Sequence, residues 1–132
     1  MPTDEPTRHQ SRERAQGLLY EAELKGERPS AVVDALVVPP DRFTTELVAA
    51  AERHQDRADT LVAAASVGWP LDRMAVVDRL VLRMAVAELL ESDGPPTAVV
   101  LDEAVELAKT YSTEESGGFV NGILSTIASQ VR

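Results

Sequence analysis

Apolar side chains recur every three or four residues along most of this 132-residue chain, the spacing that places them on one face of an α-helix. This pattern predicts helices over residues 8–25, 31–37, 74–90, 97–111 and 118–131. Residues 41–67 form a long amphipathic stretch that is either one helix or two, with a break near Gln55 and Asp56. The period-two alternation of strands is not sustained anywhere. The sequence therefore predicts an all-α fold, a compact bundle of about seven helices joined by short loops.

Helix boundaries are marked by residues that cap or break helices. Gly26 supplies a stop after the first helix. Short polar side chains that accept hydrogen bonds from the first turn of a helix are predicted to cap three others: Ser30, Asp72 and Thr97. Asp41 is predicted to open the long amphipathic stretch.

Composition limits the class of protein. With 132 residues and 44% hydrophobic content, the chain is long enough for one core, so we expect residues 8–132 to form a single domain behind a flexible tail, residues 1–7. Cysteine is absent, which excludes disulfides and thiolate metal sites. No apolar run approaches the roughly 18 residues of a membrane span. We expect a cytoplasmic protein that does not interact with membranes.

The formal charge of −9 argues against a general polyanion binder, since phosphate neutralisation needs clustered Lys and Arg. Residues 8–14 differ, because they hold three arginines and a histidine against one acid: Arg8, His9, Arg12 and Arg14 with Glu13. On a helix, the first three of these basic side chains fall within an arc of about 100°. They are candidates to grip two or three phosphates of an RNA; the alternative is an exposed, frayed terminus.

Two side chains stand apart from the faces expected for their helices. Tyr20 points away from the apolar stripe of the first helix, and Glu88 shares the direction of Val77, Val81 and Met84 in the apolar helix 74–90. A carboxylate among apolar side chains needs a cationic or hydrogen-bonding partner. That partner is either internal, for example an arginine, or part of another chain. If Tyr20 and Glu88 share a surface they define a docking site; if Glu88 is buried and paired internally, this hypothesis fails.

No catalytic, metal-binding or cofactor-binding arrangement is visible in the sequence. The two histidines, His9 and His54, are far apart, and His54 is expected at the edge of the core. The acids Asp102, Glu103 and Glu106 are better explained as the solvated face of a helix. The chain has no phosphate loop, nucleophile elbow or paired-histidine zinc motif, so we predict a protein that is not an enzyme, with no metal site and no cofactor.

The last predicted helix holds two poor helix formers, Asn121 and Gly122. Apolar residues around them repeat at helical spacing, which indicates a core helix. We expect Gly122 to permit close approach of a neighbouring helix, and Asn121 to satisfy backbone groups of the preceding loop.

Several separated motifs fall in a characteristic order along nearly the whole chain. They are Arg12–Ala15, Leu19–Glu21, Gly68–Arg73, Val77–Arg79, Leu82–Ala85, Glu88-Leu89, Asp102–Lys109 and Phe119–Gly122. In this order the chain resembles the NusB family of transcription antitermination factors, and the closing Phe-Val-Asn-Gly block is the most specific of these motifs.

The resemblance implies a fold of two small helical sub-bundles and a role in transcription antitermination. It implies binding to the boxA element of ribosomal-RNA leader transcripts, a heterodimer with the ribosomal protein NusE, and joint loading onto elongating RNA polymerase. Carried over to this sequence, RNA binding falls on the basic segment around Arg8, His9 and Arg12, to which Arg14 is added here, and NusE binding on Tyr20 and Glu88.

The chain departs from the family pattern at three positions. Ala87 stands where an aromatic residue is frequent, Asp102 where Asn is common, and Ser125 where an acid often follows the Val-Asn-Gly block. Two other functions stay open: an accessory domain of an RNA-modifying complex without boxA specificity, and a purely structural helical dimer. A homodimer is also compatible with the sequence, and would compete with partner binding if it covered the basic segment.

Overall fold

The computed structural model describes residues 5–132 and contains seven α-helices and one short 3-10 helix in that range. The helices are α1 (Arg8–Lys25), α2 (Pro29–Asp34), α3 (Arg42–Arg53), α4 (Gln55–Ala65), α5 (Val76–Leu90), α6 (Thr97–Tyr111) and α7 (Glu114–Val131), with the 3-10 helix η1 (Leu71–Arg73) before α5. The all-α prediction with about seven helices is confirmed. Of the predicted tail, residues 1–4 lie outside the described part of the chain. The assignment of residues 8–132 to one domain stays a prediction.

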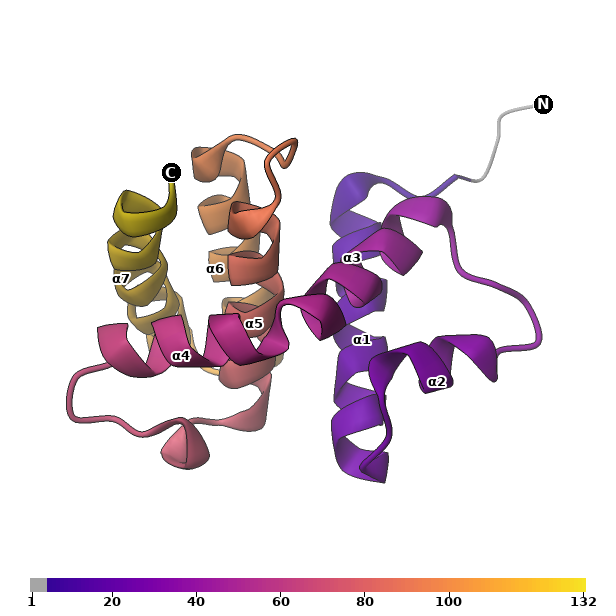
Figure 1. Ribbon diagram of the computed structural model, residues 1–132, viewed down its shortest axis with the longest axis horizontal. Coiled ribbons are helices and arrows are strands. Elements are labelled where there is room, and N and C mark those ends of the chain that lie inside the picture. The colour runs from indigo at the N-terminus through magenta and orange to yellow at the C-terminus, as the bar shows by residue number, and fades with distance from the viewer. Residues whose placement is uncertain (1–4) are drawn as a thin grey trace.

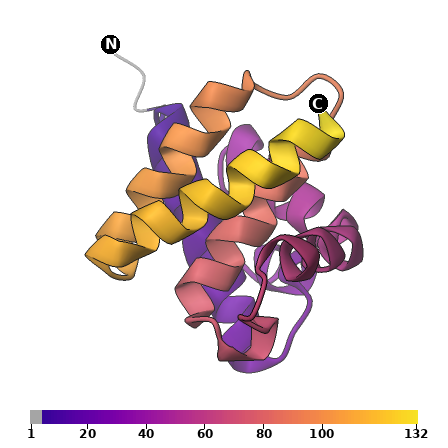
Figure 2. The same cartoon turned by 90° about the vertical axis from the view of Figure 1, so that its left-hand side faces the viewer.

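The helices form two sub-bundles that meet along α5 (Figure 1). Helices α1, α2 and α3 pack on one another, and α4, α6 and α7 pack on α5. Helix α5 also contacts α1 and α3. It is therefore the central helix of the sub-bundle with α4, α6 and α7, and it packs against the sub-bundle of α1, α2 and α3. Figure 2 shows α7 crossing in front of α5 beside α6.

Helix α5 is central because nearly its whole circumference is apolar. Eleven of its residues are buried, from Asp78 to Leu89, as expected of a helix with neighbours on several sides. Its largest side chains, Leu80, Leu82, Met84 and Leu89, have at most 2% of their surface exposed. Polar residues within this run, including Arg83 and Glu88, are therefore buried with it and need partners.

Helix α1 begins and ends where the sequence predicts, at Arg8 and Lys25. Thr7 and Gln10 form a reciprocal capping box at its start, a Thr-x-x-Gln signal that was readable in the sequence. Gly26 ends the helix with φ 64°, a left-handed conformation that glycine adopts without steric cost.

The boundaries of α2 to α4 differ in detail from the prediction. Helix α2 begins at Pro29 rather than after Ser30, because proline is well suited to the first helical position; the Ser30 N–H instead donates to Glu52 at 2.8 Å. Asp41 precedes the first residue of α3, as predicted, and its side chain caps the helix by accepting from the Thr44 N–H. The long amphipathic stretch is two helices that break at His54.

The predicted caps Ser30, Asp72 and Thr97 are wrong. Ser30 is the second residue of α2, whose cap position is Arg28 without a side-chain hydrogen bond. Asp72 lies inside the 3-10 helix, and α5 begins after Ala75 with no side-chain cap. Thr97 is the first residue of α6, and Pro96 occupies the cap position without a side-chain hydrogen bond.

Helix α7 begins at Glu114, four residues before the predicted start. Thr113 caps it and forms a reciprocal pair with Ser116, a variant of the capping box with serine in place of Glu or Gln. The close approach expected at Gly122 occurs at Gly117 instead, where an added Cβ would lie 2.8 Å from Cε of Lys109. Nothing lies within 4 Å of such a Cβ at Gly122, so that expectation is wrong.

Asn121 is exposed on the solvent side of α7 and has no side-chain hydrogen bond within residues 5–132. The predicted role of satisfying backbone groups in the loop is therefore wrong as well. The Phe-Val-Asn-Gly block packs through Phe119 and Val120, and Asn121 and Gly122 are exposed to solvent.

The chain's last residue closes the far end of α5. Arg132 donates to the carbonyl oxygens of Glu88 and Leu89, each at 3.0 Å, which satisfies acceptors that the end of α5 leaves without helical partners. Gly94 lies against this cluster, and a Cβ there would be 2.6 Å from the Glu88 carbonyl oxygen. These contacts fix the loop between α5 and α6.

Candidate RNA and partner interface

The basic residues of α1 occupy different environments. Arg8 and Arg14 are exposed, and His9 is half-buried. Arg14 has no ion pair within residues 5–132 and points to the solvent side of α1. Arg12 is the exception, because only 3% of its side chain is exposed. The structure thus divides the four predicted RNA-binding residues into three accessible cations and one buried cation.

Arg12 forms a two-pronged ion pair with Glu88. Its Nε lies 3.1 Å from Oε2 and its Nη2 lies 2.8 Å from Oε1 of Glu88. The Glu88 side chain is 6% exposed, so the pair is buried between α1 and α5. Parallel N–H···O bonds of this kind give Arg–carboxylate pairs both strength and fixed geometry.

This pair decides between the two alternatives for Glu88. Its partner is an arginine of the same chain, so the internal alternative is correct. Tyr20 is 39% exposed on α1, whereas Glu88 lies below the surface. The hypothesis that Tyr20 and Glu88 share one docking surface is therefore wrong for the chain in this state. Direct contact of either residue with a partner stays a prediction.

The Phe43 ring lies against the guanidinium groups of both Arg8 and Arg12, a contact that no local sequence pattern predicts. The Arg8 guanidinium lies 3.8 Å from the centre of the Phe43 ring, and that of Arg12 lies 5.1 Å from it; such cation–π contacts are favourable within about 6 Å. The start of α3 is fixed against α1 because Ser11 donates to Asp41 at 2.7 Å. Arg8 is thus exposed but held in a defined direction.

A groove of about 760 Å³ lies between α1, α3 and the loop from α5 to α6. Arg12 and Glu88 both line it, together with Arg8 and Phe43. The remaining wall residues are apolar or charged side chains of α3, the loop and α6: Glu46, Leu47, Ala49, Ala50, Arg53, Glu91, Asp93, Gly94, Pro95, Val99 and Glu103. The basic start of α1 and the buried ion pair therefore open onto one groove.

His9 and Glu13 link α1 to α6. Nδ1 of His9 lies 2.7 Å from Oε2 of Glu103, and the hydroxyl of Tyr111 donates to Glu13. The hydrogen bond to Glu103 raises the pKa of His9 above its usual value, with the charges of Glu103 and Glu13 acting in the same direction. His9 is therefore more readily protonated than an isolated histidine, and its charge is paired with Glu103 while its side chain stays 44% exposed.

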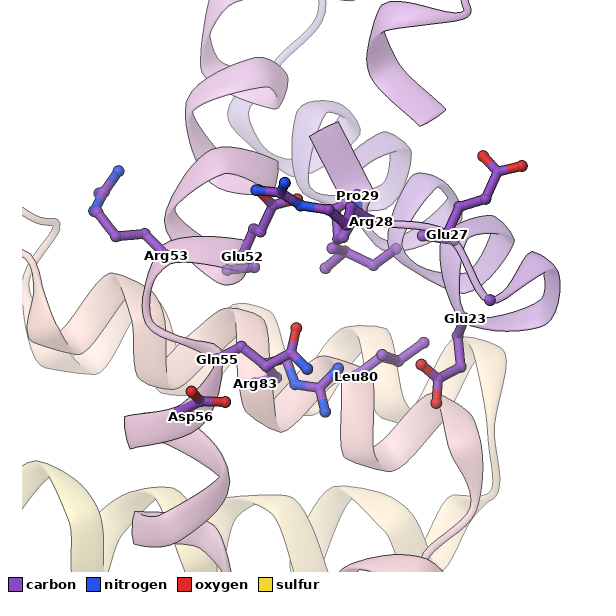
Figure 3. A pocket seen from close by; sticks show the side chains of 14 residues that line it. Glu23, Glu27, Arg28, Pro29, Glu52, Arg53, Gln55, Asp56, Leu80 and Arg83 are labelled. Atoms are coloured by element: carbon purple, nitrogen blue, oxygen red, sulfur yellow. The ribbon is translucent and has the colours of Figure 1, made fainter. Parts of the chain in front are cut away.

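A second hollow of about 450 Å³ lies beneath α2, between the two sub-bundles (Figure 3). Each arginine that lines it has an acidic partner within the described residues: Arg28 with Glu52, Arg53 with Glu91, and Arg83 with Asp59. Figure 3 shows the Arg28–Glu52 pair on one wall. This hollow offers no unpaired cation for a polyanion.

The remaining predicted positions are located as follows. His54 is half-buried at the junction of α3 and α4, with Nε2 3.4 Å from Glu91, which confirms its expected place at the edge of the core. Ala87 is buried in α5, and Asp102 and Ser125 are exposed. Among residues 5–132, no group of three or more His, Asp or Glu side chains is arranged to hold a metal ion, and no helix is long and apolar enough to span a membrane.

Fold and interface together define an all-helical protein of two sub-bundles, with exposed cations at the start of its first helix and a charged groove beside them. Comparison with known proteins gives the family. The sequence profile of the NusB family matches residues 9–129, and the chain belongs to this family.

Individual relatives agree with this assignment. The chain is 43% identical over 127 residues to the transcription antitermination protein NusB of Streptomyces griseus, covering 89% of each protein. The structure of Thermotoga maritima NusB is similar with a TM-score of 0.85 and 32% identity, over 96% of this chain and 93% of that one. A crystal structure of the antitermination factors NusB and NusE in complex with double-stranded RNA matches with a TM-score of 0.78 and 32% identity, over 93% of this chain and 96% of that one.

Proposed function

We propose that this chain is an RNA-binding transcription antitermination factor. It acts on boxA-type sequences of ribosomal-RNA leader transcripts, together with the ribosomal protein NusE and elongating RNA polymerase, in the cytoplasm and without catalysis. The observation that carries the proposal is the similarity to a NusB chain solved with NusE and RNA, which extends over 93% of this chain.

The RNA contacts fall on the accessible cations at the start of α1. Arg8 presents a guanidinium that Phe43 holds in place, Arg14 is exposed, and the raised pKa of His9 favours its charged form. These groups suit phosphates and unstacked bases of single-stranded RNA. In the isolated chain Arg12 does not contact RNA, because its guanidinium is paired with Glu88 and buried beneath the exposed cations.

The protein partner fits the groove beside these cations, and Tyr20, which is exposed on α1 but does not line the groove, is a separate predicted contact. The groove exposes Val99 and has the acids Glu46, Glu91 and Asp93 along it. Ribosomal proteins carry many Lys and Arg residues, and complementary charge steers such partners together. NusE binding here would place both proteins next to the RNA.

Titration of labelled boxA RNA, with and without NusE, tests the proposal. We expect tighter binding with NusE, and affinity that falls with salt with a slope of about −2 on logarithmic axes, because three cations release counterions at about 0.7 per phosphate for single strands. Equal affinity for a scrambled RNA in the presence of NusE would refute boxA recognition. Light scattering on the same samples measures whether a homodimer forms and competes with the partner.

Charge reversals test the residue assignments. Arg14→Glu is expected to weaken RNA binding without loss of helix content, whereas Arg57→Glu, an exposed arginine on α4, makes the same change of charge in the other sub-bundle and serves as control. Tyr20→Ala is expected to weaken NusE binding measured by calorimetry. Equal effects of Arg14→Glu and Arg57→Glu would show that only net charge matters.

A further inference from the structure

We propose that the buried Arg12–Glu88 pair is an exchange switch, in which a cationic side chain of the protein partner takes over Glu88 and releases Arg12 to the RNA. This inference rests on the proposed function and assigns a mechanism by which the partner strengthens RNA binding. It concerns two residues that the sequence places 76 positions apart and that the fold joins in one groove.

The pair is built so that one competitor is enough to release the whole guanidinium. Both hydrogen bonds from the Arg12 side chain go to Glu88, and both carboxylate oxygens of Glu88 accept only from Arg12 within residues 5–132. The guanidinium also lies 5.1 Å from the centre of the Phe43 ring. A cation that binds Glu88 therefore leaves Arg12 without an anionic partner.

Arg12 is also placed to reach the RNA site once released. It lies one helical turn after Arg8, so the two side chains share a face of α1. Arg8 is exposed at the mouth of the groove and lies 3.8 Å from the same phenylalanine ring. Rotation of the flexible Arg12 side chain toward Arg8 would add a further cation to the RNA-binding group.

The groove chemistry indicates what the competitor is. Acids line it at Glu46, Glu91, Asp93 and Glu103, and three of these have cationic partners within the described chain: Arg42, Arg53 and His9. Asp93 has no ion pair within residues 5–132. Apolar surface at Ala49, Pro95 and Val99 suits the aliphatic stem of a long side chain. An arginine or lysine of the partner matches this combination.

Exchange is required because neither half of the pair can be left alone. A buried charge without a partner is strongly unfavourable, so Arg12 leaves Glu88 only when another cation replaces it. The released guanidinium then turns into the groove that it lines, where an RNA phosphate can receive it. Each ligand then strengthens the binding of the other, and by linkage the two factors are equal.

The first experiment follows the Arg12 side chain directly by NMR, in the full-length chain with ¹⁵N-labelled arginine. The Nε–H signal of Arg12, assigned by its loss in Arg12→Lys, is expected to be protected from exchange in the isolated chain and to lose this protection when NusE is added without RNA. A signal that stays protected in a complex shown by calorimetry to be formed overturns the exchange. This readout does not depend on RNA binding.

The second experiment measures RNA affinity of Glu88→Gln, which removes the charge that holds Arg12. The matched control is Asp59→Asn, which removes the acid of a second two-pronged pair among residues 5–132, with Arg83 at 3.1 and 3.0 Å. We expect Glu88→Gln to tighten RNA binding of the isolated chain about fivefold, the lower end of typical coupling factors, and to steepen the salt slope by about 0.7 for the added phosphate contact. Asp59→Asn should do neither, and the enhancement by NusE should shrink in Glu88→Gln alone.

The outcomes separate this inference from the proposed function. If the wild-type chain binds neither boxA RNA nor NusE, the proposed function fails and the exchange fails with it. If both bind, but Glu88→Gln binds RNA no more tightly than Asp59→Asn, only the exchange is refuted. Circular dichroism confirms that each variant is folded, and the NMR measurement on the wild-type chain decides the question if Glu88→Gln does not fold.

Discussion

The stability of the chain should depend strongly on the Arg12–Glu88 pair. Replacing one residue of the pair should destabilise the fold, whereas replacing both should not. Both side chains are at most 6% exposed, so Arg12→Ala leaves a buried carboxylate without a partner. Breaking a buried pair from one side costs about 3–5 kcal/mol. At roughly 4 °C per kcal/mol for a domain of this size, we expect the melting temperature to fall by about 12–20 °C.

Replacing both residues should have a very different effect. Apolar side chains of similar volume in place of a buried ion pair are often neutral or stabilise by about 1–4 kcal/mol, so Arg12→Met combined with Glu88→Leu is expected to be at least as stable as the wild-type chain. Urea denaturation followed by circular dichroism gives both free energies by linear extrapolation. The exposed pair Arg42–Glu46, with side chains 92% and 58% exposed, provides the control, and Arg42→Ala should cost less than about 0.5 kcal/mol.

The reasoning is refuted if Arg12→Ala costs less than about 1 kcal/mol, the usual value of an exposed pair. The pair would then be solvated in solution, and both the groove and the exchange would lose their basis. A double variant less stable than either single variant would contradict the view that burial of charge, rather than loss of packing, sets the cost.

Three further predictions concern other parts of the fold. Gly122→Ala should raise stability by about 1 kcal/mol, because alanine is the better helix former and the position is open. Gly117→Ala should raise it by less, because an added Cβ would lie 2.8 and 3.0 Å from Cε and Cγ of Lys109 and 3.3 Å from Cγ1 of Val105, which must shift; urea denaturation of both variants measures the difference. His9→Gln should reduce the stability of the fold below about pH 6.5, the ordinary pKa of histidine, because protonated His9 pairs with Glu103 only in the folded chain. The difference between variant and wild type should vanish as the pH rises through the raised pKa of His9, since neutral His9 lacks this ion pair. Arg132→Ala should cost about 1–3 kcal/mol in thermal or urea denaturation, because it removes charged hydrogen bonds to the end of α5.

The helices were largely predictable because their apolar periodicity is strong and local. Helix α1 matches its predicted range, and the break between α3 and α4 falls at His54, next to the predicted Gln55. The misses concern helix ends, where a single hydrogen bond decides the boundary. Thr113 starts α7 early because Ser116 completes its capping pair, which a search for Glu or Gln at that position overlooks.

The accessible part of the interface was predictable to a lesser degree. A run of cations at the start of a helix is visible in the sequence, and Arg8 and Arg14 are exposed as expected. Phe43 was not foreseen as their neighbour, because no local pattern connects residues on α1 and α3. Only the packing of the two helices brings the ring to 3.8 Å from Arg8.

The position of Arg12 shows why direction on a helix does not determine exposure. Periodicity places Arg12 at the edge of the apolar stripe of α1, and it also shows that Glu88 on α5 needs a cation. Neither fact says which helix crosses α1 at that point. Since α5 crosses there, the cation that the sequence assigns to RNA becomes the partner that Glu88 requires. Arg12 thus neutralises the buried Glu88 in the isolated chain. It can bind RNA only when a cation of the protein partner neutralises Glu88 in its place.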